Sequence, residues 1–315
     1  MKVFWRVNKS FASFSFGFYW CFLIFSFSPV KANNMSIEKY LISFKSNRST
    51  CILRVNGMPA IENSIIPSRT MSAGINTTAF LGNGENDVEL LIGPANYKDK
   101  DSLVPDASCQ IVISKDTKDN STVVASFKLS VDSNGGFTAS ESPNYHAGEF
   151  NTEVLEGYTK NKKDFGLYKL RSKVIIKGLP KWSWADATPV TEKDIPKIRK
   201  AYSDIWNMMK VRDLDELKKI ATVSSEEMAF AEGSTTRMMF ASTGFPERVI
   251  DKKLTPIPIV WDEYDFLIYA NGRLFRLAAG YFQNSPLQFQ DENRETVFVY
   301  NPYFSIVNGK VVLVR

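Results

Sequence analysis

The chain has 315 residues, 44% of them hydrophobic, so it is long enough to bury more than one folded core. It carries 39 Lys and Arg against 34 Asp and Glu. Four of the basic residues and none of the acidic ones lie in the first 32 positions, so the remainder holds 35 basic and 34 acidic residues. A chain so close to neutrality has no electrostatic basis for binding nucleic acid, and that class is excluded.

Residues 1–32 have the pattern of a signal peptide. A basic start is followed by an aromatic-rich apolar run from Phe11 to Phe27 and by the small-x-small sequence Val30-Lys31-Ala32. We expect cleavage after about Ala32, a periplasmic or secreted protein, and no stable membrane span after cleavage. Retention as an anchor is the alternative, because the apolar run approaches the roughly 17 residues that span a bilayer.

Residues 33–180 predict an all-β antiparallel sandwich. Apolar and polar residues alternate, and turn signals recur between the alternating runs. Asn56-Gly57 predicts a hairpin between two such runs, because both positions of that turn need a positive φ. A second strand pair is expected over 79–93, with its turn at Gly84 to Asn86. The remaining strands are expected at 37–44, 109–114, 122–131 and 165–177.

Cys51 and Cys109 remain after the leader, which contains Cys21, is removed. An even pair in an exported protein predicts a disulfide, with two buried free thiols as the alternative. Two distant cysteines and the single histidine, His146, supply too few ligands for a metal. We therefore predict no metal site and no cofactor, and we interpret His146 as an ordinary loop residue.

One motif of the first half resembles a known family. Val55-Asn56-Gly57, followed by Leu81 and then Gly84-Glu85-Asn86, is similar to the sugar-binding-type jelly-roll domain of large glycoside hydrolases. The resemblance implies a β-sandwich that is often a scaffold without bound sugar. Carbohydrate binding by this domain would need exposed aromatic residues on one sheet face.

Residues 181–190 predict a linker that carries two tryptophans. Trp182 and Trp184 are two residues apart, so they share one face of an extended segment. The first interpretation is that they pack in the seam between two domains. The second is that they form an aromatic patch that contacts a ligand or a partner protein.

After Thr191 the apolar residues recur at helical spacing. Thr191 with Asp194 predicts an N-terminal cap, and Asp213 with Glu216 predicts the start of a second helix. Ser224 with Glu227 predicts a capping box for a third helix, whose face would include Met228, Ala231 and Met238. The first helix would bury one apolar face, formed by Ile195, Ile198, Tyr202, Ile205 and Met209.

From Ile257 the alternation returns, with hairpin turns at Asn271-Gly272 and Asn308-Gly309. Residues 191–315 therefore predict an α+β domain in which helices precede a curved antiparallel sheet. This element order resembles the NTF2-like cone, which implies a pocket between the helices and the sheet. Candidate residues for ligand binding there are Tyr264, Asp265 and Tyr269, of which Asp265 and Tyr269 share a strand face.

The sequence contains no nucleophile elbow, P-loop, zinc-protease or Cys-x-x-Cys motif, so no catalytic residue is predicted. The function expected is that of an exported, non-catalytic binding protein of the bacterial envelope. It would recognise and block a partner protein, as immunity and inhibitor proteins do. One alternative is an enzyme or binder of a small apolar ligand that uses the NTF2-like pocket, and another is a carbohydrate-binding module.

Overall fold

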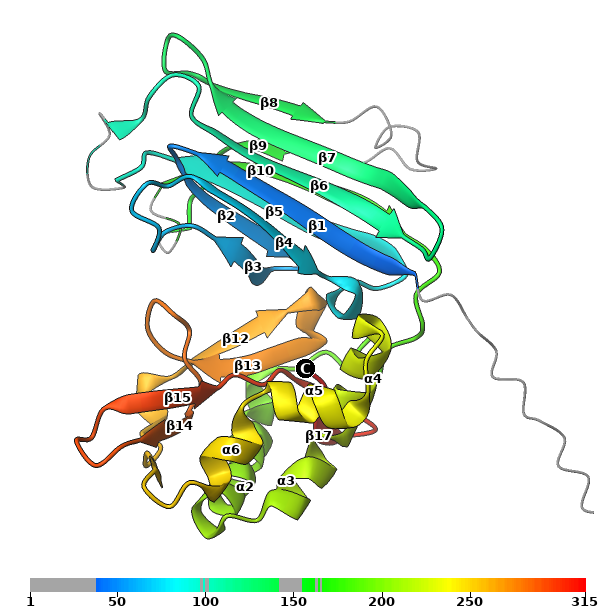
Figure 1. Ribbon diagram of the computed structural model, residues 1–315, viewed down its shortest axis with the longest axis vertical. Coiled ribbons are helices and arrows are strands. Elements are labelled where there is room, and N and C mark those ends of the chain that lie inside the picture. Colours follow the sequence, from blue (N-terminus) through cyan, green and yellow to red (C-terminus); the bar gives the residue numbers. More distant parts are fainter. Residues whose placement is uncertain (1–37, 97–98, 100–101, 142–154, 162–163, 165) are drawn as a thin grey trace, which may run out of the picture. The chain divides into compact units, whose positions relative to one another are not determined.

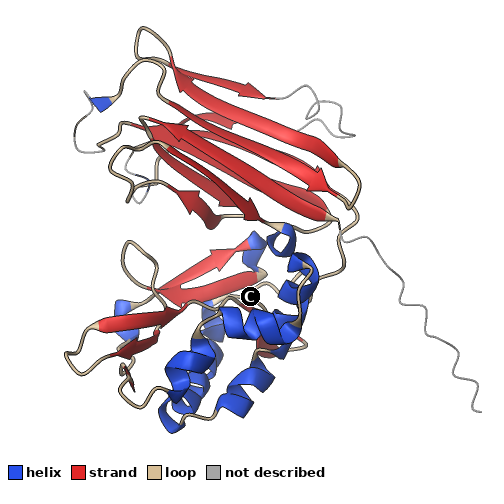
Figure 2. Cartoon of the chain, in the orientation of Figure 1, coloured by secondary structure: helices blue, strands red, loops and turns tan. Residues whose placement is uncertain are grey.

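The computed structural model describes residues 38–315, apart from 97–98, 100–101, 142–154, 162–163 and 165. The predicted leader and His146 lie outside the described residues. Most of the described chain forms antiparallel β-sheets, accompanied by a few helices (Figures 1 and 2).

The first half of the described chain forms two five-stranded antiparallel sheets (Figure 1). One sheet has the order β4-β1-β6-β7-β8 and the other β3-β2-β5-β10-β9. Inward-pointing side chains of both sheets share one apolar core, so the predicted antiparallel β architecture is confirmed. The strands are β1 (Lys39–Asn47), β2 (Thr50–Val55), β3 (Met58–Glu62), β4 (Met71–Asn76), β5 (Gly84–Gly93), β6 (Ser108–Asp116), β7 (Ser121–Val131), β8 (Phe137–Glu141), β9 (Leu155–Tyr158) and β10 (Tyr168–Ile176).

The predicted disulfide is confirmed. Cys51 on β2 and Cys109 on β6 are bonded across a sequence separation of 58 residues. Since β2 and β6 belong to different sheets, the bond ties the two sheets together. Both cysteines are completely buried in the shared core.

The hairpin between β2 and β3 turns at the predicted position. Asn56 has φ 52° and Gly57 has φ 80°, and both values lie in the left-handed region that this turn requires. The Asn56 side chain also binds across the sheet, because its Nδ2 donates to Asn86 Oδ1 at 3.0 Å and its Oδ1 accepts from Asp87 N at 3.0 Å. Two residues of the resemblance motif, Asn56 and Asn86, thus contact each other directly.

The second predicted strand pair is wrong. Residues Thr78–Phe80 form a short 3-10 helix, η1, and β5 begins only at Gly84. The buried Asn86 side chain explains the difference, since it accepts from Gly82 N at 2.9 Å and donates to Gly82 O at 2.8 Å. These bonds hold the backbone before β5 in a tight loop. The Asn86 side chain thus takes the place of the partner strand that Gly82 would need to lie in a sheet.

Five α-helices follow residue 191, and two of the predicted caps are confirmed. Thr191 N donates to Asp194 Oδ2 at 3.0 Å ahead of α2, and Glu216 N donates to Asp213 Oδ1 at 3.0 Å at the start of α3. Of the predicted apolar face of α2, all but Ile195 are buried. The helices are α2 (Ile195–Val211), α3 (Leu214–Ile220), α4 (Thr222–Glu232), α5 (Thr236–Ser242) and α6 (Phe245–Ile250), and a 3-10 turn, η4 (Glu192–Asp194), precedes them.

The third predicted cap is wrong. Ser224 lies inside α4, which begins at Thr222, and Glu227 forms long-range contacts described below. Gly233 ends α4 with φ 63°, so Met238 belongs to the next helix, where it is exposed. A glycine in the left-handed conformation is a common helix terminator, and here it separates two short helices.

Two antiparallel sheets complete the chain, with orders β11-β14-β15 and β12-β13-β16-β17. The hairpins predicted at Asn271-Gly272 and Asn308-Gly309 are confirmed, since they join β12 to β13 and β16 to β17. Two further 3-10 turns are η5 (Trp261–Glu263) and η6 (Ala270–Gly272). The strands are β11 (Thr255–Pro256), β12 (Asp265–Tyr269), β13 (Leu274–Ala278), β14 (Leu287–Gln290), β15 (Thr296–Tyr300), β16 (Phe304–Val307) and β17 (Lys310–Leu313).

Candidate binding cleft

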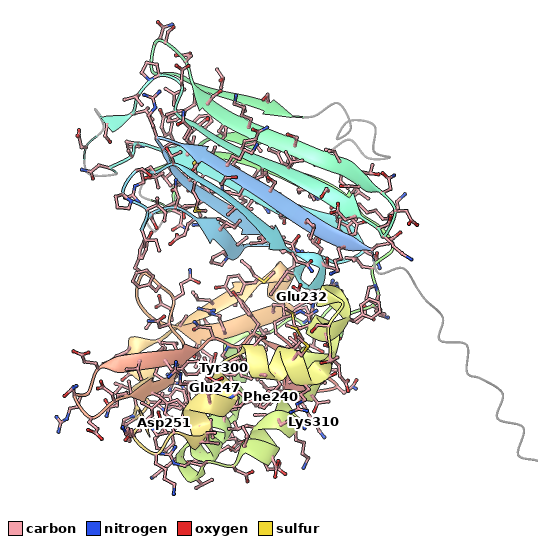
Figure 3. The ribbon with its side chains drawn as sticks, in the orientation of Figure 1. Glu232, Phe240, Glu247, Asp251, Tyr300 and Lys310 are labelled. Carbon is pink, nitrogen blue, oxygen red and sulfur yellow. A yellow bond between two sulfur atoms is a disulfide. The ribbon has the colours of Figure 1, made fainter. Side chains whose placement is uncertain are left out.

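The space between the helices and these last sheets is filled by side chains. Tyr202 of α2 is fully buried beside Phe304 of β16, with ring centroids 5.0 Å apart, and donates to Leu277 O at 3.5 Å. Phe240 and Tyr300, labelled in Figure 3, belong to the same apolar core. The pocket expected inside the cone is therefore occupied by the protein's own core.

Trp182 and Trp184 are buried, with 3% and 4% of their surfaces exposed. Trp182 Nε1 donates to Leu81 O at 2.8 Å and Trp184 Nε1 donates to Ala79 O at 3.2 Å. Through these hydrogen bonds both indoles attach the segment 181–190 to the loop that precedes β5. An aromatic patch for a partner needs exposed rings, so neither tryptophan enters the candidate site.

Arg315 and Glu227 complete this seam. The Arg315 guanidinium lies 5.1 Å from the Trp182 ring centroid, its Nε donates to Ala79 O at 2.8 Å, and its Nη1 forms an ion pair with Glu227. Glu227 Oε1 also accepts from Ser183 N at 2.6 Å. Burial lowers the pKa of Arg315, because desolvation disfavours the charged guanidinium, and Glu227 opposes that effect.

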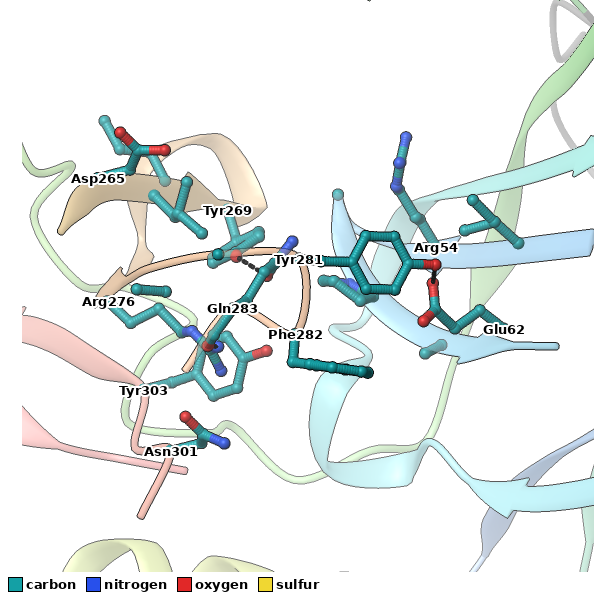
Figure 4. Close-up of a pocket in the computed structure, with 18 of the residues that line it drawn as sticks. Arg54, Glu62, Asp265, Tyr269, Arg276, Tyr281, Phe282, Gln283, Asn301 and Tyr303 are labelled. Atoms are coloured by element: carbon teal, nitrogen blue, oxygen red, sulfur yellow. Dashed lines mark hydrogen bonds between the residues drawn. The ribbon is translucent and has the colours of Figure 1, made fainter. Parts of the chain in front are cut away.

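A cleft of about 950 Å³ lies on the other face of β12 and β13 (Figure 4). One wall comes from β12, β13 and the loop after β13. The other wall comes from β2, β3 and β5 of the sandwich. The side chains most relevant to binding are Arg54, Glu62, Asp265, Leu267, Tyr269, Arg276, Tyr281, Phe282 and Tyr303.

Two edge strands border the cleft. Within the described chain, β3 pairs only with β2 and β12 pairs only with β13. Pro59 interrupts the amide donors of β3, whereas every residue of β12 has an N–H group. An edge strand of this kind can pair with an extended segment of another chain.

Arg54 is already neutralised on its wall of the cleft. Its Nη2 lies 2.5 Å from Asp164 Oδ1, and its Nη1 lies 3.7 Å from Glu89 Oε2. Asp164 is buried, and its Oδ2 accepts from Thr159 Oγ1 at 2.9 Å. The pKa of Arg54 is raised because these two carboxylates outweigh the desolvation of the guanidinium.

Arg276 lies on β13, in the wall opposite Arg54, and is 5% exposed. Its guanidinium carbon is 5.1 Å from the Tyr303 ring centroid, and its Nη2 donates to the Gln283 carbonyl. Its Nε is buried without a hydrogen-bond partner. Among the described residues no carboxylate forms an ion pair with it, in contrast to Arg54.

The cleft tyrosines stay protonated at neutral pH. Burial raises the pKa of Tyr269 and of Tyr303 above the ordinary phenol value, and Arg276 opposes the shift at both. Tyr269 Oη donates to Gln283 Oε1 at 3.1 Å. A phenol with a raised pKa is protonated at neutral pH and can donate a hydrogen bond to a group in the cleft.

The rim of the cleft carries two exposed aromatic rings. Tyr281 and Phe282 follow β13 and are 51% and 66% exposed. Figure 4 shows the Tyr281 hydroxyl reaching the opposite wall, where it lies 3.5 Å from Glu62 Oε2 and contacts Ser64 Oγ. These contacts link the loop after β13 to the end of β3.

Of the candidates named from the sequence, the structure brings Asp265 and Tyr269 into the cleft. Tyr264 lies elsewhere, packed against the helical core, with its hydroxyl 3.4 Å from Gln288 Nε2. Sequence reasoning missed Arg276 and Phe282, whereas Tyr281 is suggested by its position opposite the strand that carries Asp265 and Tyr269. The available signal was an arginine in the centre of the apolar strand Leu274–Ala278.

Comparisons with known proteins give no indication of function, so the proposal below depends on the residues of the cleft. No protein-family model, curated protein or solved structure matches the chain. Within the described residues, no cluster of three or more His, Cys, Asp or Glu side chains is placed to hold a metal ion. No helix in that part of the chain is long and apolar enough to cross a membrane.

Proposed function

We propose that the protein is an exported, non-catalytic binding protein that captures an extended segment of a partner protein in the cleft and thereby blocks that partner. The observation that carries the proposal is the cleft itself, bordered by β12, an edge strand of its sheet in the described chain, and lined by aromatic and charged side chains. Main-chain pairing with an edge strand supplies affinity, and pockets for alternate side chains supply specificity.

The size and composition of the cleft support a polypeptide segment as its occupant. Leu267 and Tyr269 offer apolar surface on one wall, and Ile52 and Ile61 offer it on the other. Exposed aromatic residues such as Phe282 are enriched where proteins bind one another, because a large ring buries much area with little loss of conformational entropy.

An oxidising compartment of the bacterial envelope is part of the proposal. The buried Cys51–Cys109 disulfide is compatible with it, because such bonds persist in exported proteins. The NTF2-like assignment for residues 191–315 is likewise kept as a proposal, supported by helices that precede antiparallel strands. In this proposal the partner binds outside the cone, on the face of β12–β13 away from the helices.

Photo-crosslinking from the cleft rim tests the proposal. A benzoylphenylalanine in place of Phe282, 66% exposed, is expected to give one discrete adduct in the native envelope. The same group in place of Met238, 62% exposed on α5, is the matched control and should give none. Ala60→Trp, which fills the cleft from β3, should abolish the adduct at 282.

Mass spectrometry of the adduct identifies the crosslinked segment, which should be extended and contiguous. The proposal fails if positions 282 and 238 give the same adducts. It also fails if Ala60→Trp leaves the adduct at 282 unchanged.

A further inference from the structure

Arg276 differs from Arg54, the other arginine of the cleft, because no carboxylate among the described residues forms an ion pair with it. A buried charge is stable only when it is paired or hydrogen-bonded, and an arginine carries five N–H donors. This guanidinium donates to the Gln283 carbonyl, and its buried Nε has no hydrogen-bond partner among the described residues. Stacking against Tyr303 compensates the charge only in part.

We propose that Arg276 is the anchor of the cleft for a carboxylate, supplied by an Asp or Glu side chain of the bound segment. This inference rests on the proposed function and names the chemistry that the partner must present. A carboxylate accepts two parallel hydrogen bonds from a guanidinium, which fixes both the position and the orientation of the bound group.

Arg54 is excluded as the anchor by its own contacts. Asp164 and Glu89 already neutralise it, and removal of its charge would leave the buried Asp164 unpaired. Arg54 therefore has a structural role on its wall, while Arg276 on the opposite wall has no carboxylate that it must hold. The contrast assigns ligand recognition to Arg276.

The neighbours of Arg276 suit a peptide carboxylate. Tyr269 and Tyr303 line the same part of the cleft and keep their hydroxyl protons at neutral pH. On β12, Leu267 is the residue in register with Arg276. A segment that pairs with the edge strand β12 would therefore run past the guanidinium and could direct one acidic side chain to it.

A display library of random decapeptides, selected on the disulfide-bonded protein, tests the inference. The selected peptides are expected to share an Asp or Glu at one position. Binding of a resynthesised peptide should weaken at least tenfold with Arg276→Met, and as much when the peptide's Asp is changed to Asn. The two changes together should cost little more than either alone, because both remove the same contact.

Arg273→Met is the matched control, since Arg273 is exposed and lies three residues away, outside the cleft. It should leave peptide affinity unchanged. Thermal unfolding of Arg276→Met should occur at or above the temperature of the unmodified protein, because the variant removes an unpaired buried charge.

Peptides that lack an acidic residue, or that bind Arg276→Met as well as the original protein, would overturn the carboxylate inference and leave the proposed function standing. Failure to select any peptide would count against the proposed function and the inference together. If Arg276→Met does not fold, the Asp→Asn change in the peptide decides alone: undiminished binding overturns the inference.

Discussion

Replacing Cys51 and Cys109 together by alanine is expected to lower the free energy of unfolding by about 4 kcal/mol. The disulfide closes a loop of 58 residues and so restricts the unfolded chain. Both positions are completely buried, so alanine adds no polar group to the core. The bond also joins β2 to β6, and its loss removes the covalent link between the two sheets within their shared core.

Urea denaturation of the two proteins, with and without a reductant, measures the effect. The reductant should destabilise the original protein to the level of the double alanine variant and should leave that variant unchanged. A loss below about 1 kcal/mol would show that the bond does not restrict the unfolded chain as the entropic model requires.

Glu227→Ala is expected to lower the free energy of unfolding by about 3–5 kcal/mol, the usual cost of breaking a buried ion pair from one side. The Arg315 side chain is 1% exposed and would keep its charge without a partner. The backbone N–H of Ser183 would also lose its acceptor. The contacts of Trp182 with Arg315 and Leu81 should be lost before the rest of the fold unfolds.

The neighbouring Glu226→Ala provides the control, because Glu226 is exposed on the same helix and should change stability by less than about 0.5 kcal/mol. Arg315→Met combined with Glu227→Ala should cost less than the sum of the single changes, since no buried charge remains. Equal losses for Glu226→Ala and Glu227→Ala, measured by urea denaturation, would contradict the role of the pair.

Local patterns predicted the features that depend on local contacts. The face of α2 follows from helical spacing, and the turns at Asn56-Gly57 and Asn271-Gly272 follow from the φ values that these residues allow. The disulfide was predictable because only two cysteines follow the predicted leader. The helix face and the turns depend on residues close together in sequence. The disulfide depends only on there being two cysteines to pair.

Side-chain hydrogen bonds and ion pairs that residue spacing does not reveal decided where the predictions were wrong. Ser224 and Glu227 have the spacing of a capping box, but Glu227 instead binds Arg315 and the Ser183 backbone. The segment before Gly84 alternates like a strand, but the Asn86 side chain holds it as a loop. Spacing alone shows neither the distant partners of Glu227 nor the hydrogen bonds that Asn86 forms with the backbone four residues before it.

Only some of the residues that line the cleft could be predicted from the sequence. Asp265 and Tyr269 were named because they share a strand face, which is a local property. Their neighbours in space, Arg54 and Glu62, lie about 200 positions earlier, and no periodic pattern relates the two groups. The feature that distinguishes Arg276, the lack of a carboxylate partner among the described residues, is visible only in the fold.

Amide hydrogen exchange along β12 tests most directly whether the cleft takes an extended segment of a partner. With the partner bound, the outward-facing amides of Asp265–Tyr269 should exchange at least tenfold more slowly, because they would gain main-chain acceptors. Exchange in β7 of the sandwich should stay unchanged and serves as the internal reference. Slower exchange confined to β7 and its neighbours, with β12 unaffected, would contradict a binding site in this cleft.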